Sequence, residues 1–251
     1  MKHATSNIRI FPDLSSLSKA AADHICELAR AAIQARGRFS LVLSGGSTPK
    51  MTYDLLTGAG LDWTRIHAFF GDERCVPPDH PDSNYRMARL TLLDRVPIPQ
   101  ENIHRMSGEI LPEQAAAEYE QTLRDFFHTA NRGSKPNNPN SFDLVLLGLG
   151  EDGHTASLFP SSPALQEKER WVVAVPHVGP PEPQVTRISL TLPVINAADQ
   201  VTFLAAGEKK AAILKRALAS PSPSQPLLPV QMVHPSSGNL LWLVDQAAKS
   251  A

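Results

Sequence analysis

The stretch FDLVLLGLGEDGHTASLFP, residues 142–160, joins the most apolar run of the chain to a glycine-rich turn with two acids and a histidine. A short, nearly continuous apolar run is typical of a strand that is buried on both faces of a parallel sheet. Polar residues directly after such a strand lie where doubly wound sheets bind ligands. The stretch therefore predicts a buried strand over 142–150, and it raises the question of what His154 does.

Outward from this stretch, short apolar runs alternate with longer amphipathic segments along most of the chain. Besides 142–150, strands are predicted at residues 8–12, 39–44, 66–73, 171–176, 187–192 and 201–206. Helices are predicted from Asp13 to a stop at Gly37, and over residues 48–56, 83–96, 112–130 and 208–218. This alternation is typical of an α/β fold, with a mostly parallel sheet flanked by helices.

Two polar or proline-rich segments are predicted to be loops. Residues 131–140 (NRGSKPNNPN) are the clearest polar loop, and closely spaced prolines exclude a helix in 220–229 (SPSPSQPLLP). The chain shows no internal repeat. We therefore expect residues 1–251 to form a single domain with small embellishments.

Composition narrows the classes of partner. The formal net charge is -1, so no basic surplus points to nucleic acid, and a small neutral or anionic metabolite is the better expectation. Cys26 and Cys75 lie far apart without a CxxC pairing, which indicates neither a disulfide framework nor a metal site, and no cofactor is expected. The first residues lack the apolar core of a signal peptide, and no apolar run approaches the roughly 20 residues that span a bilayer. We expect a soluble cytoplasmic protein without a membrane partner, as a monomer or a weak homo-oligomer.

The segment LVLSGGSTPK, residues 41–50, predicts a cradle for a phosphate group. A strand that ends in Ser44, Gly45, Gly46, Ser47 and Thr48 places hydroxyls and free backbone N–H groups at the positive end of a helix. The glycines let an anion approach the backbone closely. The alternative is an ordinary strand-to-helix turn with a serine or threonine cap.

The segment FFGDERCVPP places three charged residues directly after an apolar strand. Arg74 could grip phosphate oxygens through charge-assisted hydrogen bonds, while Asp72 or Glu73 could orient it or bind sugar hydroxyls. The alternative is a salt-bridge cluster on the surface. Spacing leaves open whether Asp72 is a substrate ligand or the partner of an arginine.

The glycine-rich turn places Asp152 two residues before His154, so that a carboxylate and an imidazole can serve one pocket. A histidine in such a place can be neutral near pH 7 and accept a proton from water. The alternative is a structural histidine at the end of a buried strand. The flanking glycines and the buried strand favour the catalytic interpretation.

Three further cations stand near strand ends. Arg187 begins a strand after a proline-rich loop, and Lys209 and Lys210 lie in the first turn of a helix. Cations at a helix N-terminus oppose the helix dipole unless a negative group offsets them, which a bound phosphate would do. Lys209 is expected to point to solvent.

Together these segments resemble the 6-phosphogluconolactonases, within a superfamily that includes the glucosamine-6-phosphate deaminases. The segments that carry the resemblance occur in family order: LSGGSTPK, FFGDERCVPPDHPDSNYRMA, DLVLLGLGEDGHTASLFP, RISLTLPVIN, GEKKAAILKRAL and GNLLWLVDQAA. The resemblance implies a modified Rossmann-like fold and a phosphate site made by the serine-glycine loop, Arg74 and a basic residue. It also implies His154 as general base and Lys210 as the family lysine.

The implied reaction is hydrolysis of 6-phospho-D-glucono-1,5-lactone to 6-phosphogluconate, without a metal. We expect His154 to take a proton from the attacking water, and Asp152 to set the orientation of the imidazole. The deaminases are the first alternative, but their turn continues into Asn-Glu-Pro, where this chain has Leu158, Phe159 and Pro160. A sugar-phosphate sensor without activity is the second alternative, although no DNA-binding segment accompanies it here.

Overall fold

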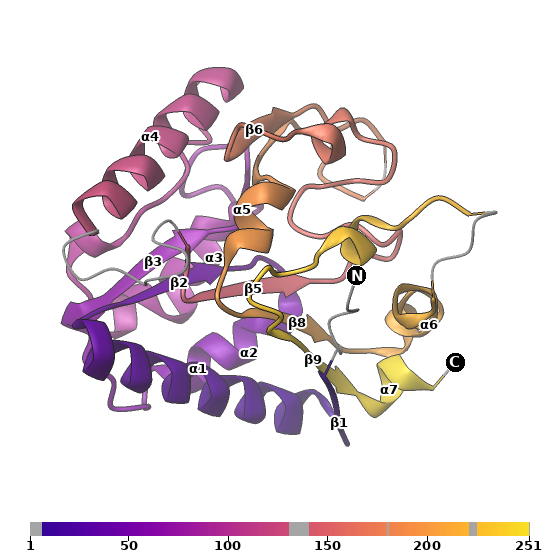
Figure 1. Cartoon of the computed structure of the whole chain (residues 1–251), viewed down its shortest axis with the longest axis horizontal. Helices are drawn as coiled ribbons and strands as arrows, with labels where there is room; N and C mark the ends of the chain where they lie inside the picture. Colours follow the sequence, from indigo (N-terminus) through magenta and orange to yellow (C-terminus); the bar gives the residue numbers. More distant parts are fainter. Residues whose placement is uncertain (1–6, 131–140, 180, 221–224, 251) are drawn as a thin grey trace.

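The computed structural model describes residues 7–130, 141–179, 181–220 and 225–250, and two β-sheets organise them (Figure 1). The larger sheet is parallel throughout and has the strand order β1 (Asn7–Phe11), β9 (Leu240–Asp245), β8 (Val201–Ala205), β5 (Leu144–Gly148), β2 (Phe39–Leu43), β3 (Ile66–Phe70). The smaller, antiparallel sheet has the order β4 (Asp72–Arg74), β7 (Arg187–Leu190), β6 (Val172–Val175). The predicted α/β fold with a mostly parallel sheet is thereby confirmed.

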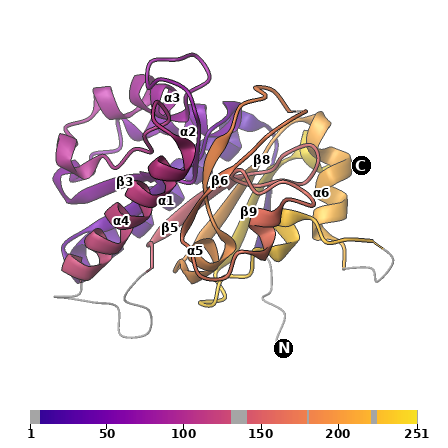
Figure 2. The same ribbon diagram turned by 90° about the horizontal axis from the view of Figure 1, so that it is seen from above.

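Helices cover both faces of the larger sheet. They are α1 (Leu14–Arg36), α2 (Ser47–Leu56), α3 (Asn84–Thr91), α4 (Pro112–Ala130), α5 (Leu192–Ala197), α6 (Ala211–Leu218) and α7 (Gln246–Lys249). In Figure 1, α1 and α2 run along one face, while α5 and the smaller sheet lie on the other. Figure 2 shows α4 near the β3 end of the sheet and α6 near the β9 end. No helix in the described part of the chain is long and apolar enough to span a membrane.

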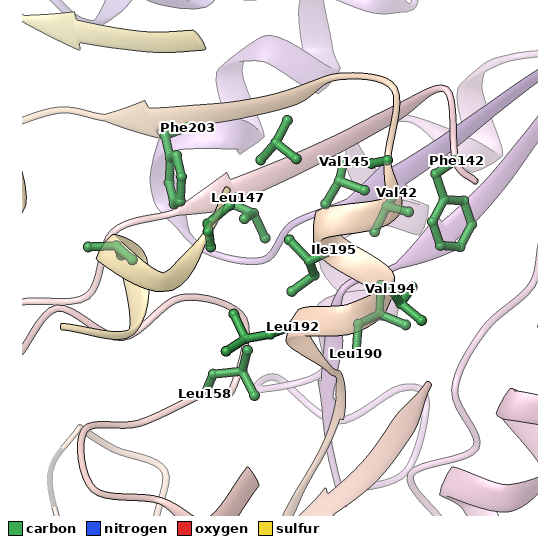
Figure 3. Packing of buried hydrophobic residues seen from close by; sticks show 14 of the residues in the cluster. Val42, Phe142, Val145, Leu147, Leu158, Leu190, Leu192, Val194, Ile195 and Phe203 are labelled. Carbon is green, nitrogen blue, oxygen red and sulfur yellow. The ribbon is translucent and has the colours of Figure 1, made fainter. Parts of the chain in front are cut away.

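The strand pattern explains why both faces need cover. In β2, Leu41 and Leu43 face the cluster formed with α1 and α2, while Val42 faces the cluster that includes α4, α5 and the smaller sheet. Successive side chains of a strand point to opposite faces, so a strand with apolar side chains on both faces must be covered on both. β5 follows the same rule, and Figure 3 shows Val145 and Leu147 packed beside Ile195 of α5.

Helix α1 begins and ends where the sequence predicts. The Asp13 side chain accepts a hydrogen bond of 2.7 Å from the Ser16 N–H, which satisfies a free donor of the first turn. Gly37 adopts the left-handed conformation that commonly ends a helix, with φ of 76°. Leu17, Ala21 and Ile25 are buried at helical spacing, so the apolar stripe that predicted the helix is also its packing face.

Several predicted boundaries are wrong. The strand predicted at 66–73 divides at Gly71, and its last residues form β4 in the smaller sheet. The helix predicted at 83–96 ends at Thr91, and the strand predicted at 187–192 ends at Leu190, where the chain turns into α5. β9 was not predicted. At Gly71 the break is decided by a distant segment, because β4 pairs with β7 of the smaller sheet. After Thr91 and Leu190, the apolar pattern continues past the end of the element.

The remaining predictions for loops and for the last helix have mixed outcomes. The first turn of the helix predicted at 208–218 is a 3-10 turn, Glu208–Lys210. The predicted loop 131–140 lies outside the described residues, as do residues 221–224 of the second loop. Its residues 225–228 are irregular as predicted, whereas Pro229 begins a short 3-10 helix.

The strand order fixes where a ligand can bind. β2 and β5 are neighbours; from β2 the chain proceeds to β3 on one side, and from β5 it later reaches β8 on the other side. The loops that leave β2 and β5 therefore diverge to opposite faces and open a crevice at the carboxyl ends of the strands. The two glycine-rich segments of the sequence follow these two strands.

Candidate active site

A cavity of about 560 Å³ opens at this crevice. Its lining includes every predicted site residue except Ser47 and Thr48: Ser44, Gly45, Gly46, Asp72, Arg74, Asp152, His154, Arg187 and Lys210. The remaining lining residues are Asn84, Gly148, Leu149, Gly150, Glu151, Ala156, Pro181 and Glu182. Segments between Ser44 and Lys210 that lie far apart in the chain thus meet in one cavity, as the sequence predicts for residues at strand ends.

The turn after β5 holds His154 against Asp152. Oδ1 of Asp152 lies 2.5 Å from Nδ1 of His154 and accepts a hydrogen bond of 3.0 Å from the backbone N–H of the same histidine. In a neutral imidazole, a carboxylate at Nδ1 selects the tautomer that carries its proton there, so Nε2 keeps its lone pair. Nε2 has no hydrogen-bond partner among the described residues. The pair therefore presents a proton acceptor in the lining of the cavity.

The Asp152 carboxylate is suited to hold this tautomer because it stays ionised. Partial burial raises its pKa, but the hydrogen bonds and charge of His154 outweigh burial and bring the pKa below the ordinary value. An ionised Asp152 also stabilises the imidazolium that forms when His154 accepts a proton.

Gly150 makes room for the imidazole. A Cβ atom at this position would lie 2.1 Å from Nδ1 of His154, which no side chain could tolerate without displacing the ring. The Gly150 N–H also donates a hydrogen bond of 2.8 Å to the His154 carbonyl. The imidazole also packs against Phe159, with ring centroids 4.8 Å apart.

Two arginines form the cationic side of the cavity. Arg74 of β4 and Arg187 of β7 are register partners in the smaller sheet, and Arg187 is only 3% exposed. Burial and the neighbouring charge of Arg74 lower the pKa of Arg187. Two adjacent, partly desolvated guanidinium groups repel each other, and a bound anion would offset that cost.

Hydrogen bonds hold each guanidinium but leave donors unused. Nη1 of Arg74 donates to the Asp82 carbonyl at 2.7 Å and to Oδ1 of Asn84 at 2.9 Å, and Nη2 of Arg187 donates to the Pro183 carbonyl at 2.9 Å. The buried Nε atoms of both arginines lack a hydrogen-bond partner in the described part of the chain. The cavity lining includes both side chains, and guanidinium N–H groups are strong donors to an oxyanion.

The serine-glycine loop adds the N-terminus of α2. Gly46 is the N-cap, with φ of 100°, and no side chain caps the helix, so the first N–H groups have no side-chain acceptor. The structure places Ser47 and Thr48 in the first turn of α2, with Ser47 exposed and neither hydroxyl in the cavity lining. Of the three hydroxyls predicted for this loop, only that of Ser44 belongs to the lining.

Lys210 reaches the cavity from the segment after β8. Its Nζ lies 3.9 Å from a carboxylate oxygen of Glu151, beside the His154 turn, and burial lowers its pKa. Lys209 is exposed, as predicted. The lysine that the resemblance implies is therefore the one near the cavity.

The sequence did not reveal that Glu73 binds the first residues of α3, or that Asn84 lines the cavity. The Glu73 carboxylate is buried away from the cavity and accepts hydrogen bonds from the N–H groups of Arg74, Asn84 and Tyr85 and from the Ser83 hydroxyl. Burial raises its pKa despite these four donors. Strand alternation is the signal that separates Glu73 from its neighbours, because Asp72 and Arg74 share the opposite face. For Asn84, the sequence contains no comparable signal.

Comparison with known proteins gives consistent matches. The family model of glucosamine-6-phosphate isomerases and 6-phosphogluconolactonases matches residues 12–242. The chain is 44% identical over 242 residues to the 6-phosphogluconolactonase of Nostoc sp., covering 96% of each sequence. It is 41% identical over 247 residues to that of Homo sapiens, covering 96% of this chain and 92% of the human one.

Solved structures agree with the sequence matches. The 6-phosphogluconolactonase from Trypanosoma cruzi superposes with a TM-score of 0.86 at 30% identity, covering 99% of this chain and 97% of that one. A monomeric glucosamine-6-phosphate deaminase has a TM-score of 0.78 at 19% identity, covering 97% of this chain and 99% of that one, which shows the fold alone. Because the family model spans most of the chain and close relatives align over nearly all of it, the chain belongs to the family of glucosamine-6-phosphate isomerases and 6-phosphogluconolactonases.

Proposed function

We propose that the protein hydrolyses 6-phospho-D-glucono-1,5-lactone to 6-phospho-D-gluconate, a step of the oxidative pentose phosphate pathway. The observation that carries this proposal is the composition of one cavity, in which a histidine–aspartate pair and two arginines are both part of the lining. The arginines suit a phosphate, and the pair suits a water molecule that must lose a proton. The named relatives support the same reaction.

The proposed mechanism uses His154 twice. Nε2 takes a proton from water as the water oxygen attacks the lactone carbonyl carbon, which gives a tetrahedral oxyanion and an imidazolium paired with Asp152. When the bond from this carbon to the ring oxygen breaks, the imidazolium returns the proton to the leaving oxygen. The new carboxylic acid then ionises, so each turnover releases one proton to solution.

The anion site contributes by placing the reacting carbon. Arg74, Arg187, Lys210 and the Ser44–Gly46 loop are proposed to bind the phosphate and the sugar. Binding energy from this remote group can be used to orient the carbonyl toward the activated water, which raises turnover as well as affinity. Ser47 and Thr48 would contribute through their backbone N–H groups rather than their hydroxyls.

A deaminase reaction is less well supported by the same cavity. The positions where the deaminases carry Asn-Glu-Pro are Leu158, Phe159 and Pro160, and none of these side chains transfers a proton. Phe159 instead packs against His154. A cytoplasmic location, a monomeric or weakly associating state and a single domain over 1–251 stay predictions from the sequence.

The test is proton release from freshly generated 6-phosphogluconolactone at neutral pH with EDTA present, after subtraction of the spontaneous rate. D-glucono-1,5-lactone, without a phosphate, is the matched substrate control, and glucosamine 6-phosphate is assayed for ammonia. We expect fast acid production from the phosphorylated lactone, slower production from the control and no ammonia. Ammonia release would establish the deaminase instead, and binding without either reaction would establish a sensor.

A further inference from the structure

The Asp72 carboxylate accepts hydrogen bonds from Ser157 and Asn84, and not from Arg74 or Arg187. Its Oδ2 accepts a hydrogen bond of 2.7 Å from the Ser157 hydroxyl, and its Oδ1 accepts one of 3.2 Å from Nδ2 of Asn84. The described residues contain no ion pair between Asp72 and Arg74 or Arg187. Since Asp72 is only 8% exposed, these two bonds determine how its carboxylate lies.

Asn84 connects Asp72 to the anion-binding side of the cavity. Its Oδ1 accepts the 2.9 Å hydrogen bond from Nη1 of Arg74, and its Nδ2 also donates to the backbone carbonyl of Asp72 at 2.9 Å. A Cβ atom on Gly45 would lie 2.0 Å from the same Oδ1, so the amide packs directly on the backbone of the serine-glycine loop. A movement of Arg74 or of this loop would therefore displace Asn84.

Ser157 connects Asp72 to the turn that carries His154. It lies three residues after the histidine and is fully buried, and its backbone N–H donates to the Ser189 hydroxyl at 3.1 Å. The start of the turn is closed by the hydrogen bond between the Gly150 N–H and the His154 carbonyl. The hydroxyl of Ser157 thus ties the far end of the turn to β4, the strand of Arg74.

We propose that Asp72 is a positioning residue that couples occupancy of the anion-binding side of the cavity to the placement of His154, through Asn84 on one side and Ser157 on the other. This inference rests on the proposed function. Its physical basis is that a buried carboxylate with two hydrogen bonds has few alternative arrangements, so both partners must move with it. An anion that orders Arg74 then also orders the turn of His154.

The experiment separates coupling from binding by supplying the lactone and the anion as two separate molecules. D-xylono-1,5-lactone lacks C6 and its phosphate, and inorganic phosphite is supplied separately as the anion. Hydrolysis of this lactone is measured with and without phosphite for the wild type, Ser157→Ala and Asp72→Asn. Inorganic phosphate, as a competitive inhibitor of the full substrate, reports anion affinity. Ser18→Ala, which removes a buried hydroxyl on α1, is the matched control.

We expect phosphite to accelerate hydrolysis by the wild type and by Ser18→Ala. In Ser157→Ala the acceleration should fall about tenfold or more, while the inhibition constant of phosphate stays within about twofold, because Ser157 is not part of the cavity lining. Asp72→Asn keeps the size of the side chain but cannot accept both hydrogen bonds, so it should lose the acceleration too. Arg74→Ala should instead weaken phosphate inhibition.

Three results would overturn the inference. The first is a wild type that phosphite does not accelerate, and the second is an unchanged acceleration in both Ser157→Ala and Asp72→Asn. The third is a loss of equal size with and without phosphite, which would mean that Ser157 supports the turn without coupling it to the anion. A wild type that fails to hydrolyse the full phosphorylated lactone would instead contradict the proposed function itself.

Discussion

The two ring nitrogens of His154 have different surroundings, and this difference determines its chemistry. Nδ1 faces the ionised Asp152 at 2.5 Å, while Nε2 is free of protein partners among the described residues. The aspartate is two residues away in the chain, so the local turn alone brings the two groups together. The candidate base could therefore be predicted from sequence, because its main partner is a sequence neighbour.

At the residue scale, replacement of His154 by glutamine should leave the fold intact and remove the proton acceptor. The histidine side chain is one-fifth exposed, so the structural cost is small. Loss of a general base typically lowers turnover by about 10²–10⁴-fold. Proton release above the spontaneous rate measures the effect, and phosphate inhibition checks that the anion site is unchanged. Turnover close to that of the wild type would rule out His154 as the base.

At the element scale, the turn between β5 and the smaller sheet positions His154 in the cavity. It begins at Gly148 on the larger sheet and ends at Ser157, which is bonded to residues of β4 and β7. A single turn therefore joins the two sheets and carries the histidine between them. Its glycine-rich composition was visible in the sequence, whereas the attachment of its far end was not.

Gly150→Ala tests this element without replacing an ionisable group. The added Cβ would lie 2.1 Å from Nδ1 of His154, the atom that contacts Asp152, so the ring must shift and turnover should fall by about tenfold or more. Gly58→Ala is the matched control, because a Cβ there meets no atom within 4 Å. Steady-state rates of both variants provide the measurement. Equal rates would show that the turn tolerates a displaced ring.

At the scale of the whole molecule, two histidines outside the cavity link stability to pH. Nδ1 of His67 lies 3.3 Å from Nε2 of His104, and the rings stack beside Phe69 and Phe126. Burial lowers the pKa of each histidine to about 4, with the charge of Arg38 adding to the effect at His67. Both imidazoles are therefore neutral in the folded protein at neutral pH.

The sign of the pH dependence follows from these lowered pKa values. Between the unfolded value of 6.5 and about 4, the unfolded chain binds more protons than the folded protein, so the free energy of unfolding falls as the pH falls. Thermal unfolding from pH 7.5 to 4.5 should show a decreasing Tm. The double variant His67→Gln, His104→Gln should have a flatter profile. An unchanged slope in this variant would assign the effect to other groups.

Local patterns in the sequence determined much of this protein: the parallel strands, the buried apolar face of α1, the polar residues at strand ends and the pairing of Asp152 with His154. These features depend on the periodicity of burial and on neighbours a few residues apart. Only the tertiary structure decided where β4 separates from β3, which face of the charged triplet meets the cavity, and that Asp72 bonds Ser157 and Asn84. The partner of a buried polar group is set by desolvation and geometry among segments far apart in the chain, and no local pattern records that choice.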